Sequence, residues 1–138
     1  MMSNVGYSGT PLPRKLGIKP ESRLAFVDAP PEFLGLLEPL PEGVRLMKRV
    51  HPPLDLIVLF VDERASLVER FNRLRDSLVP SGALWVAWPK RSSGVATDVT
   101  ENVVRDVALE RGLVDTKVCA ISEVWSGLRL VRRLKDRV

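Results

Sequence analysis

The chain has 138 residues, a hydrophobic fraction of 45% and a charged fraction of 28%, which are typical of one globular domain. This length is enough to bury one core but too short for a separate substrate domain. No apolar run approaches the roughly 20 residues that span a bilayer, and residues 1–10 have neither a cationic start nor an apolar block. We therefore expect neither a membrane span nor a signal peptide.

Cysteine and histidine each occur once, which excludes several kinds of chemistry. Cys119 cannot form an internal disulfide, which fits a cytoplasmic protein. It lies in an apolar, strand-like run, so we interpret it as a buried structural thiol rather than a nucleophile. His51 has no cysteine cluster near it, so no metal site is expected. With no partners assigned to His51, the sequence predicts no catalytic residue.

The formal charge is +4, and much of the excess lies near the C-terminus, at Arg129, Arg132, Arg133, Lys135 and Arg137. Elsewhere charges alternate in sign, as they do on a solvated helix face. We interpret the basic end as a solvated terminus. Weak nucleic-acid binding through this end remains an alternative.

The N-terminal half divides into an arm and the start of the domain. Residues 1–22 are predicted to form an extended arm, because residues 1–15 are rich in Gly, Ser and Pro. The domain itself covers 23–138. Its first elements are expected to be a strand at 23–28, a short helix at 31–38 and a strand at 44–50.

The stretch 55–89 is the most informative part of the chain. Residues 56–61 are all apolar, which indicates a strand buried on both faces, as at the centre of a parallel α/β sheet. The helix expected at 65–78 has one apolar stripe, with Asp62 as its N-cap. Its outward residues are Glu69, Arg70, Arg73 and Asp76. A Pro80-Ser81-Gly82 turn then leads to a second apolar strand at 83–88.

The C-terminal part is predicted to contain a helix and two closing strands. The helix covers 100–111, starts either at Thr100 or at a capping box of Asp98 and Glu101, and stops at Gly112. The strands cover 118–124 and 128–132, with a tight reversal at 125–127.

This order of elements resembles a shortened class I S-adenosylmethionine-dependent methyltransferase, and the turn and strand around 78–86 resemble that superfamily's post-helix segment. The resemblance implies an α/β, three-layer Rossmann-like domain with five or six mostly parallel strands and an antiparallel C-terminal edge. Between Val50 and Asp55 there is no room for a helical crossover, so the third strand of the full fold is lost. The second strand either stops near Met47, which the prolines at 52 and 53 favour, or runs antiparallel.

The whole chain also resembles a small bacterial family that is classed as a domain of unknown function. The motifs that carry this resemblance are Gly6-Tyr7-Ser8-Gly9-Thr10-Pro11-Leu12, Lys15-Leu16-Gly17-Ile18-Lys19, Trp88-Pro89-Lys90, Thr97-Asp98 and Val124-Trp125-Ser126-Gly127-Leu128-Arg129. The resemblance implies a shared fold and brings no activity with it.

The cofactor site of a methyltransferase is not apparent in the sequence. The turn after the first strand reads Asp28-Ala29-Pro30-Pro31, with no glycine and with two residues that lack an amide donor. Where an acidic residue would meet the ribose, the chain has Lys48 and Arg49. We therefore predict a non-catalytic binding or regulatory module with no cofactor. A methyltransferase with an atypical S-adenosylmethionine pocket is the alternative.

The candidate ligand site lies where the parallel strands end, since ligands of open α/β sheets bind outside the carboxyl ends. Positive charge, hydroxyl donors and a flexible glycine in the loop favour an anion such as phosphate or carboxylate. A protein partner is a second possibility, and a solvated connecting loop is the alternative reading. The candidate residues are Asp28, Trp88, Lys90, Arg91, Ser92, Ser93 and Gly94.

Overall fold

The computed structural model describes residues 9–137, which contain a six-stranded sheet in the order β2-β1-β3-β4-β6-β5. Strands β1 to β4 pair in parallel, whereas β6 is antiparallel to both β4 and β5. The predicted mostly parallel sheet with an antiparallel C-terminal edge is confirmed. The strands are β1 (Arg23–Val27), β2 (Arg45–Met47), β3 (Leu54–Phe60), β4 (Leu78–Pro89), β5 (Leu113–Ala120) and β6 (Trp125–Arg132).

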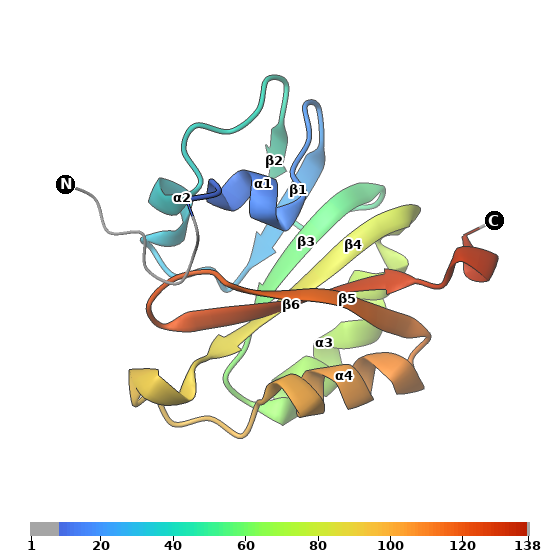
Figure 1. The fold of residues 1–138 in the computed structure, drawn as a ribbon. Coiled ribbons are helices and arrows are strands. Elements are labelled where there is room, and N and C mark those ends of the chain that lie inside the picture. The colour runs from blue at the N-terminus through green and yellow to red at the C-terminus, as the bar shows by residue number, and fades with distance from the viewer. Residues whose placement is uncertain (1–8, 138) are drawn as a thin grey trace.

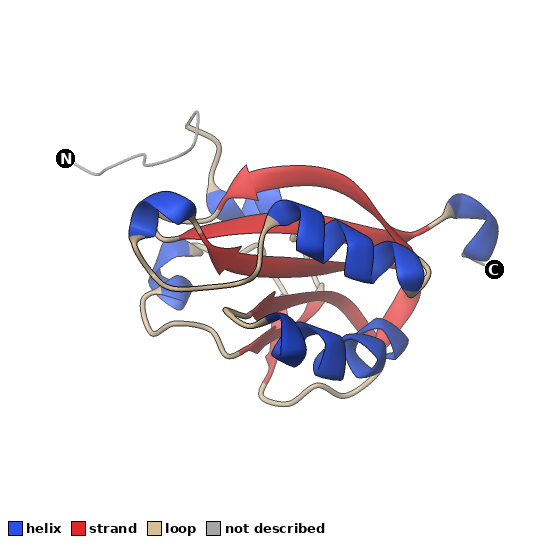
Figure 2. Cartoon of the chain, turned by 90° about the horizontal axis from the view of Figure 1, so that it is seen from below, coloured by secondary structure: helices blue, strands red, loops and turns tan. Residues whose placement is uncertain are grey.

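Helices cover both faces of the sheet, which gives three layers (Figures 1 and 2). Strand β3 shows why, because its side chains alternate between two apolar clusters. Ile57 and Leu59 pack with α3 and α4, while Val58 and Phe60 pack with α1 and α2. The helices are α1 (Leu12–Leu16), α2 (Phe33–Leu36), α3 (Arg64–Asp76) and α4 (Glu101–Glu110), with 3-10 turns η1 (Arg91–Ser93) and η2 (Leu134–Asp136).

The β2 side of the sheet is where the chain is shortened. Strand β2 runs parallel to β1 and stops at Met47, as the prolines at 52 and 53 indicated. Residues 48–53 then return to β3 without a helix, so within 9–137 no third strand lies outside β2. All three residues of β2 are exposed. This flank therefore lacks both a strand and the crossover helix that would cover it.

The prediction of an extended arm over 1–22 is wrong for the segment that the structure describes as α1. Leu12 and Leu16 are one helical turn apart, and both are buried against the sheet together with Ile18. Gly17 ends the helix in a left-handed conformation with φ of 83°. The arm's residues 1–8 lie outside the described residues. Leu12, Leu16 and Ile18 thus belong to the domain's core, and the segment that carries them is not separate from the domain.

Two predicted turns are also displaced. Residues 80–82 lie inside β4, where the pairing with β3 shifts register, so they form an irregularity of the strand rather than its start. The last reversal lies at 121–124 instead of 125–127. There the Ser122 hydroxyl accepts hydrogen bonds from the amides of Val124 and Trp125. Both predicted turns are wrong, because strand pairing holds residues 80–82 within β4 and residues 125–127 within β6 despite their turn composition.

None of the helices in the described part of the chain has the length and apolar composition needed to cross a membrane.

Candidate functional site

The loops that follow β3 and β4 are tied to each other. Asp98, in the loop before α4, accepts a hydrogen bond of 2.7 Å from the amide of Arg64 in the first turn of α3. Thr97 donates its hydroxyl to the carbonyl of Asp62 at 2.6 Å. A carboxylate at a helix N-terminus satisfies a free amide and complements the helix dipole. Asp98, and not Asp62 as predicted, therefore serves α3, and it occupies the place where a ligand anion would bind.

The N-terminus of α4 is capped within its own segment. The Thr100 side chain accepts from the amide of Val103 at 3.2 Å, as one of the two predicted alternatives required. Gly112 follows the helix with φ of 85°, which fits the predicted left-handed stop. Neither end of α4 therefore depends on a ligand.

The predicted anion loop forms the 3-10 turn η1, and part of its polar capacity is used internally. The Ser93 hydroxyl donates to the Lys90 carbonyl at 2.6 Å and accepts from the amide of Val95. The Lys90 amide donates to the carbonyl of Val124 at 2.7 Å. The side chains left open to solvent are those of Arg91 and Ser92, next to exposed Gly94. This geometry is that of a self-sufficient connection with one exposed arginine.

The two tryptophans of β4 lie on opposite faces, because they are three residues apart in one strand. Trp88 is 7% exposed and packs in the cluster under α3 and α4. Trp85 is fully buried in the other cluster, where its indole N–H donates to the carbonyl of Leu16 at 2.9 Å. Both serve the core, and Trp88 does not join the other candidate residues in a site.

The turn after β1 has a tight backbone, and aromatic side chains pack beside it. Asp28 adopts φ of 57°, and the amide of Phe33 donates to the carbonyl of Pro30 at 3.0 Å. A chain of edge-to-face aromatic contacts lies between α2 and the carboxyl ends of β1 and β3. Its ring centroids are separated by 4.9 Å for Phe26–Phe33, 4.8 Å for Phe33–Phe60 and 5.0 Å for Phe60–Trp125.

A pocket of about 410 Å³ lies on the other side of β1, against α3. It is where the missing crossover leaves the sheet uncovered. Asp28 lines it and forms an ion pair with Arg70. No residue of 90–94 belongs to its lining, so the structure separates Asp28 from the rest of the predicted site. The lining consists of Val27, Asp28, Val50, Glu69, Arg70, Arg73 and Leu74.

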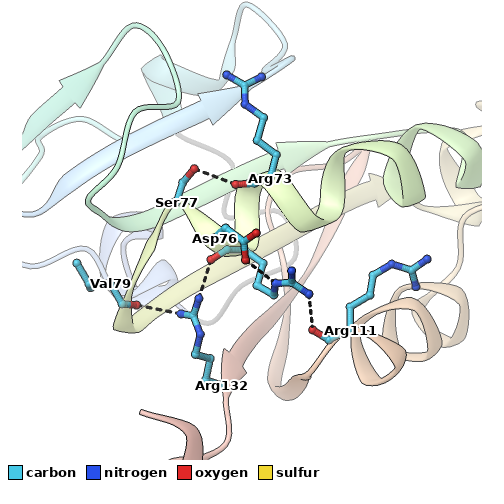
Figure 3. A network of polar contacts seen from close by, with 7 residues as sticks. Arg73, Asp76, Ser77, Val79, Arg111 and Arg132 are labelled. Carbon is cyan, nitrogen blue, oxygen red and sulfur yellow. Dashed lines mark hydrogen bonds and ion pairs between the residues drawn. The ribbon is translucent and has the colours of Figure 1, made fainter. Parts of the chain in front are cut away.

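Two arginines line this pocket, and of these Arg73 forms neither an ion pair nor a side-chain hydrogen bond with the described residues. Figure 3 shows it turned away from the polar network at the end of α3. In that network Arg75 binds Asp76 and the carbonyl of Arg111, and Arg132 donates to the carbonyls of Val79 and Arg75. Arg132, predicted as part of a solvated basic end, is therefore a structural tie between β6 and α3.

The remaining reactive residues show no catalytic arrangement. Burial raises the pKa of the Cys119 thiol, which opposes the thiolate form that a nucleophile needs. His51 is exposed, and residues 9–137 contain no cluster of histidine, cysteine and carboxylate side chains that could hold a metal ion.

The sequence reasoning missed the pocket because it treated Arg70 and Arg73 as part of a solvated helix face. The available signal was the short connection between β2 and β3, since a missing crossover helix leaves part of the outward face of α3 beside bare sheet. The aromatic contacts were also missed, although Phe26 and Phe60 both stand at strand ends.

Solved methyltransferases share this fold. Ribosomal protein L11 methylase from Lactobacillus delbrueckii subsp. bulgaricus matches with a TM-score of 0.54 and 15% identity over 88% of this chain and 75% of that one. Magnesium protoporphyrin IX methyltransferase from Synechocystis PCC 6803, with bound SAM, gives 0.57 and 9% over 88% and 74%. A SAM-dependent methyltransferase from Aquifex aeolicus gives 0.57 and 12% over 85% of each chain. At these identities the likeness shows the fold alone, and the chain has a methyltransferase-like Rossmann fold.

A comparison with curated proteins gives no match. A family model does match, over residues 47–134, which is more than half of the chain. The matched stretch runs from the end of β2 to η2 and so includes the sheet centre, α3 and α4. The chain belongs to the family described as "Protein of unknown function (DUF3052)".

Proposed function

We propose that the protein is a non-catalytic binding module that takes a small anionic molecule in the pocket between β1 and α3. The observation that carries this proposal is the position of Arg73. Its guanidinium borders a pocket of about 410 Å³ and has no partner among the residues of the described chain. A planar guanidinium forms paired hydrogen bonds with phosphate or carboxylate oxygens, which a lysine cannot match.

The rest of the lining describes the ligand further. Val27, Val50 and Leu74 give the pocket an apolar side, which favours a ligand with a hydrocarbon body as well as an anionic group. The ion pair with Asp28 fixes Arg70 on one wall. Arg73 is thus the free cation and Arg70 the positioned one. A phosphate monoester or carboxylate with a compact apolar body matches both parts.

S-adenosylmethionine does not fit the residues at the usual place for it. The turn after β1 lacks glycine and two amides, the aromatic chain from Phe26 to Trp125 fills the space beside it, and Asp98 occupies the N-terminus of α3. Exposed Lys48 and Arg49 follow β2 where a ribose hydroxyl would meet a carboxylate. We therefore place the function outside methyl transfer, with an atypical methyltransferase as the second candidate because the fold is shared.

Titration calorimetry with phenyl phosphate and with inorganic phosphate tests the pocket. We expect phenyl phosphate to bind more tightly, because only it has a body for the apolar side. Arg73→Gln should weaken its binding by about 10-fold or more, the loss expected for one charge-assisted hydrogen-bond pair. Arg91→Gln is the matched control, since Arg91 is the exposed arginine of η1 and lies outside the pocket.

Each outcome separates the candidate sites. Loss of binding in Arg91→Gln, with Arg73→Gln unchanged, would return the site to the loop 90–94. Failure of both phosphates to bind would contradict the pocket proposal. A titration with S-adenosylmethionine that shows micromolar affinity would establish the methyltransferase alternative instead.

A further inference from the structure

On one face of the sheet, β5 and β6 place two cationic side chains opposite each other. Lys117 of β5 lies directly opposite Arg129 of β6 in the strand pairing, so their side chains share one face of the sheet. Arg129 is also opposite Trp85 of β4, which belongs to the cluster on the α1–α2 side. The Lys117–Arg129 pair therefore faces away from α3 and α4. Like charges directly opposite in a sheet reduce stability, so folding alone does not explain why this pair is present.

Arg137, just after η2, adds a third cation beside the pair. Burial, and then the charge of Arg137, lower the pKa of Arg129. Arg137 is held in place by a hydrogen bond of 2.9 Å from its Nε to the carbonyl of Arg132. We call Lys117, Arg129 and Arg137 the basic face.

No carboxylate of the described residues neutralises the basic face. The ion pairs in 9–137 include none of its three members. Arg129 instead donates to the hydroxyl of Thr116 at 3.2 Å. The nearby carboxylate of Asp115 pairs with Arg105 of α4. The positive charge is therefore available to an anion from outside.

The basic face is also left open by the helices. The apolar cluster of α1 and α2 reaches β5 and β6 only at their turn, through Ile121, Cys119 and Trp125. Lys117 is exposed and Arg129 half-buried, and Figure 1 shows β5 and β6 with no helix in front of them. An uncovered surface results, with Arg133 and Lys135 exposed at its end.

We propose that the basic face binds the phosphate backbone of single-stranded nucleic acid without sequence preference. The charges complement a chain of phosphates, and neutralising them releases counterions. Within 9–137 no helix or ribbon projects from this face to enter a duplex groove, whereas a single strand can lie along an uncovered sheet face. The partly buried Trp125 is engaged with Phe60, so base stacking contributes little and the contact is mainly with the backbone. This site is separate from the pocket under "Proposed function" and does not depend on it.

An anionic membrane is the competing occupant, because Leu134 is 79% exposed between Arg133 and Lys135. A single apolar side chain on a 3-10 turn offers little area for insertion compared with an amphipathic helix. Nucleic acid is therefore the partner for which the larger part of the surface, the two strands, is suited.

Fluorescence anisotropy with a labelled 20-nucleotide oligothymidylate tests the proposal on the full chain. We expect binding in 50 mM NaCl that weakens steeply as salt is raised. The triple variant Lys117→Gln, Arg129→Gln, Arg137→Gln should lose about 10-fold or more in affinity, and its log–log salt slope should fall by about 2. The control is Arg45→Gln, Lys48→Gln, Arg49→Gln, which removes the same charge from exposed residues at the β2 flank.

The single variant Lys117→Gln keeps the test valid if the triple variant unfolds. It should weaken oligonucleotide binding while its melting temperature stays equal or rises, since it relieves the repulsion with Arg129. Equal losses in the triple variant and its control would show attraction by net charge alone and overturn the proposal. The proposal also fails if the wild-type protein does not bind the oligonucleotide, whether or not it binds phosphatidylglycerol vesicles.

Discussion

The centre of the sheet is buried on both faces, whereas its two flanks are exposed. At the centre, β3 and β4 are covered on both faces, and Ile57, Val58, Leu84 and Trp85 are fully buried. At one flank the three residues of β2 are all exposed, and at the other β5 carries exposed Lys117 and Val118. Arg73 and the basic face form no ion pair with a described carboxylate, and both lie beside missing cover. The two binding sites that we propose therefore both lie where a covering element is absent.

The usual cofactor position has few groups free to bind a ligand. The carboxyl edge of β1, β3 and β4 is completed by the chain itself, through Asp98 on α3 and the rings between Phe26 and Trp125. The Thr97 and Asp98 side chains there are hydrogen-bonded and the rings are packed, while Arg91 and Ser92 stay exposed in η1. A ligand would have to displace these contacts, whereas at the flanks it would add to the existing ones.

The largest expected effect is at the centre. Trp85→Ala removes a fully buried ring and the hydrogen bond to the Leu16 carbonyl, and should lower the free energy of unfolding by about 3–5 kcal/mol. Val118→Ala, at a residue of β5 that is 51% exposed, should change it by less than about 0.5 kcal/mol. Urea unfolding at pH 7 measures both.

If Trp85→Ala does not fold, Trp85→Phe can replace it, because it keeps much of the packing but removes the indole donor. Trp85→Phe should still lower the free energy of unfolding more than Val118→Ala does. Equal losses at the two positions would mean that centre and flank do not differ in stability as the burial pattern requires.

A smaller effect is expected where the carboxyl edge is tied. Asp98→Ala removes the acceptor for the Arg64 amide and should cost about 1 kcal/mol, the usual value for a helix N-terminal partner. Asp62→Ala should cost less than about 0.5 kcal/mol, because Asp62 contributes its carbonyl rather than its side chain. Chemical denaturation of both variants compares them directly. A larger loss for Asp62→Ala would restore the cap that the local sequence favours.

The fold was predictable wherever burial leaves a periodic pattern. The all-apolar run at 56–61 and the apolar stripe of α3 define the centre without knowledge of distant contacts. The missed elements depend on such contacts. Helix α1 is short and has prolines at its start, and its burial depends on the sheet. Residues 80–82 have turn composition, but pairing with β3 keeps them in β4.

The site was predictable only by position along the sheet. Strand ends correctly placed Asp28 and the loop 90–94 at one edge, but the sequence could not show that Ser93 bonds within its own loop or that Trp88 is core. It also could not show which part of α3 borders an uncovered sheet. Arg73 has the composition of any solvated arginine, and only the missing crossover makes it a pocket residue.

The smallest expected effect concerns the network at the end of α3, which joins centre to flank. The hydrogen bond from Arg75 lowers the pKa of Asp76, against an opposing effect of burial. A carboxylate with a lowered pKa in the folded state stabilises that state above its ordinary pKa, and the contribution is lost as pH falls through the folded-state value. Asp76 is 65% exposed, so this contribution should be only a few tenths of a kcal/mol at pH 7.

Asp76→Asn should therefore lower the free energy of unfolding slightly at pH 7, and the difference from wild type should shrink as the pH falls below the ordinary pKa of an aspartate and Asp76 becomes protonated. Urea titrations at a series of pH values measure it, with the same substitution in an Arg75→Gln background as the control. In that background the pH-dependent part should vanish, because the hydrogen bond from Arg75 is its main cause. A pH dependence that survives would assign the effect to Arg132 instead, whose charge also lowers the pKa of Asp76. In that case the tie between β6 and α3, rather than the helix end alone, would couple the flank to the centre.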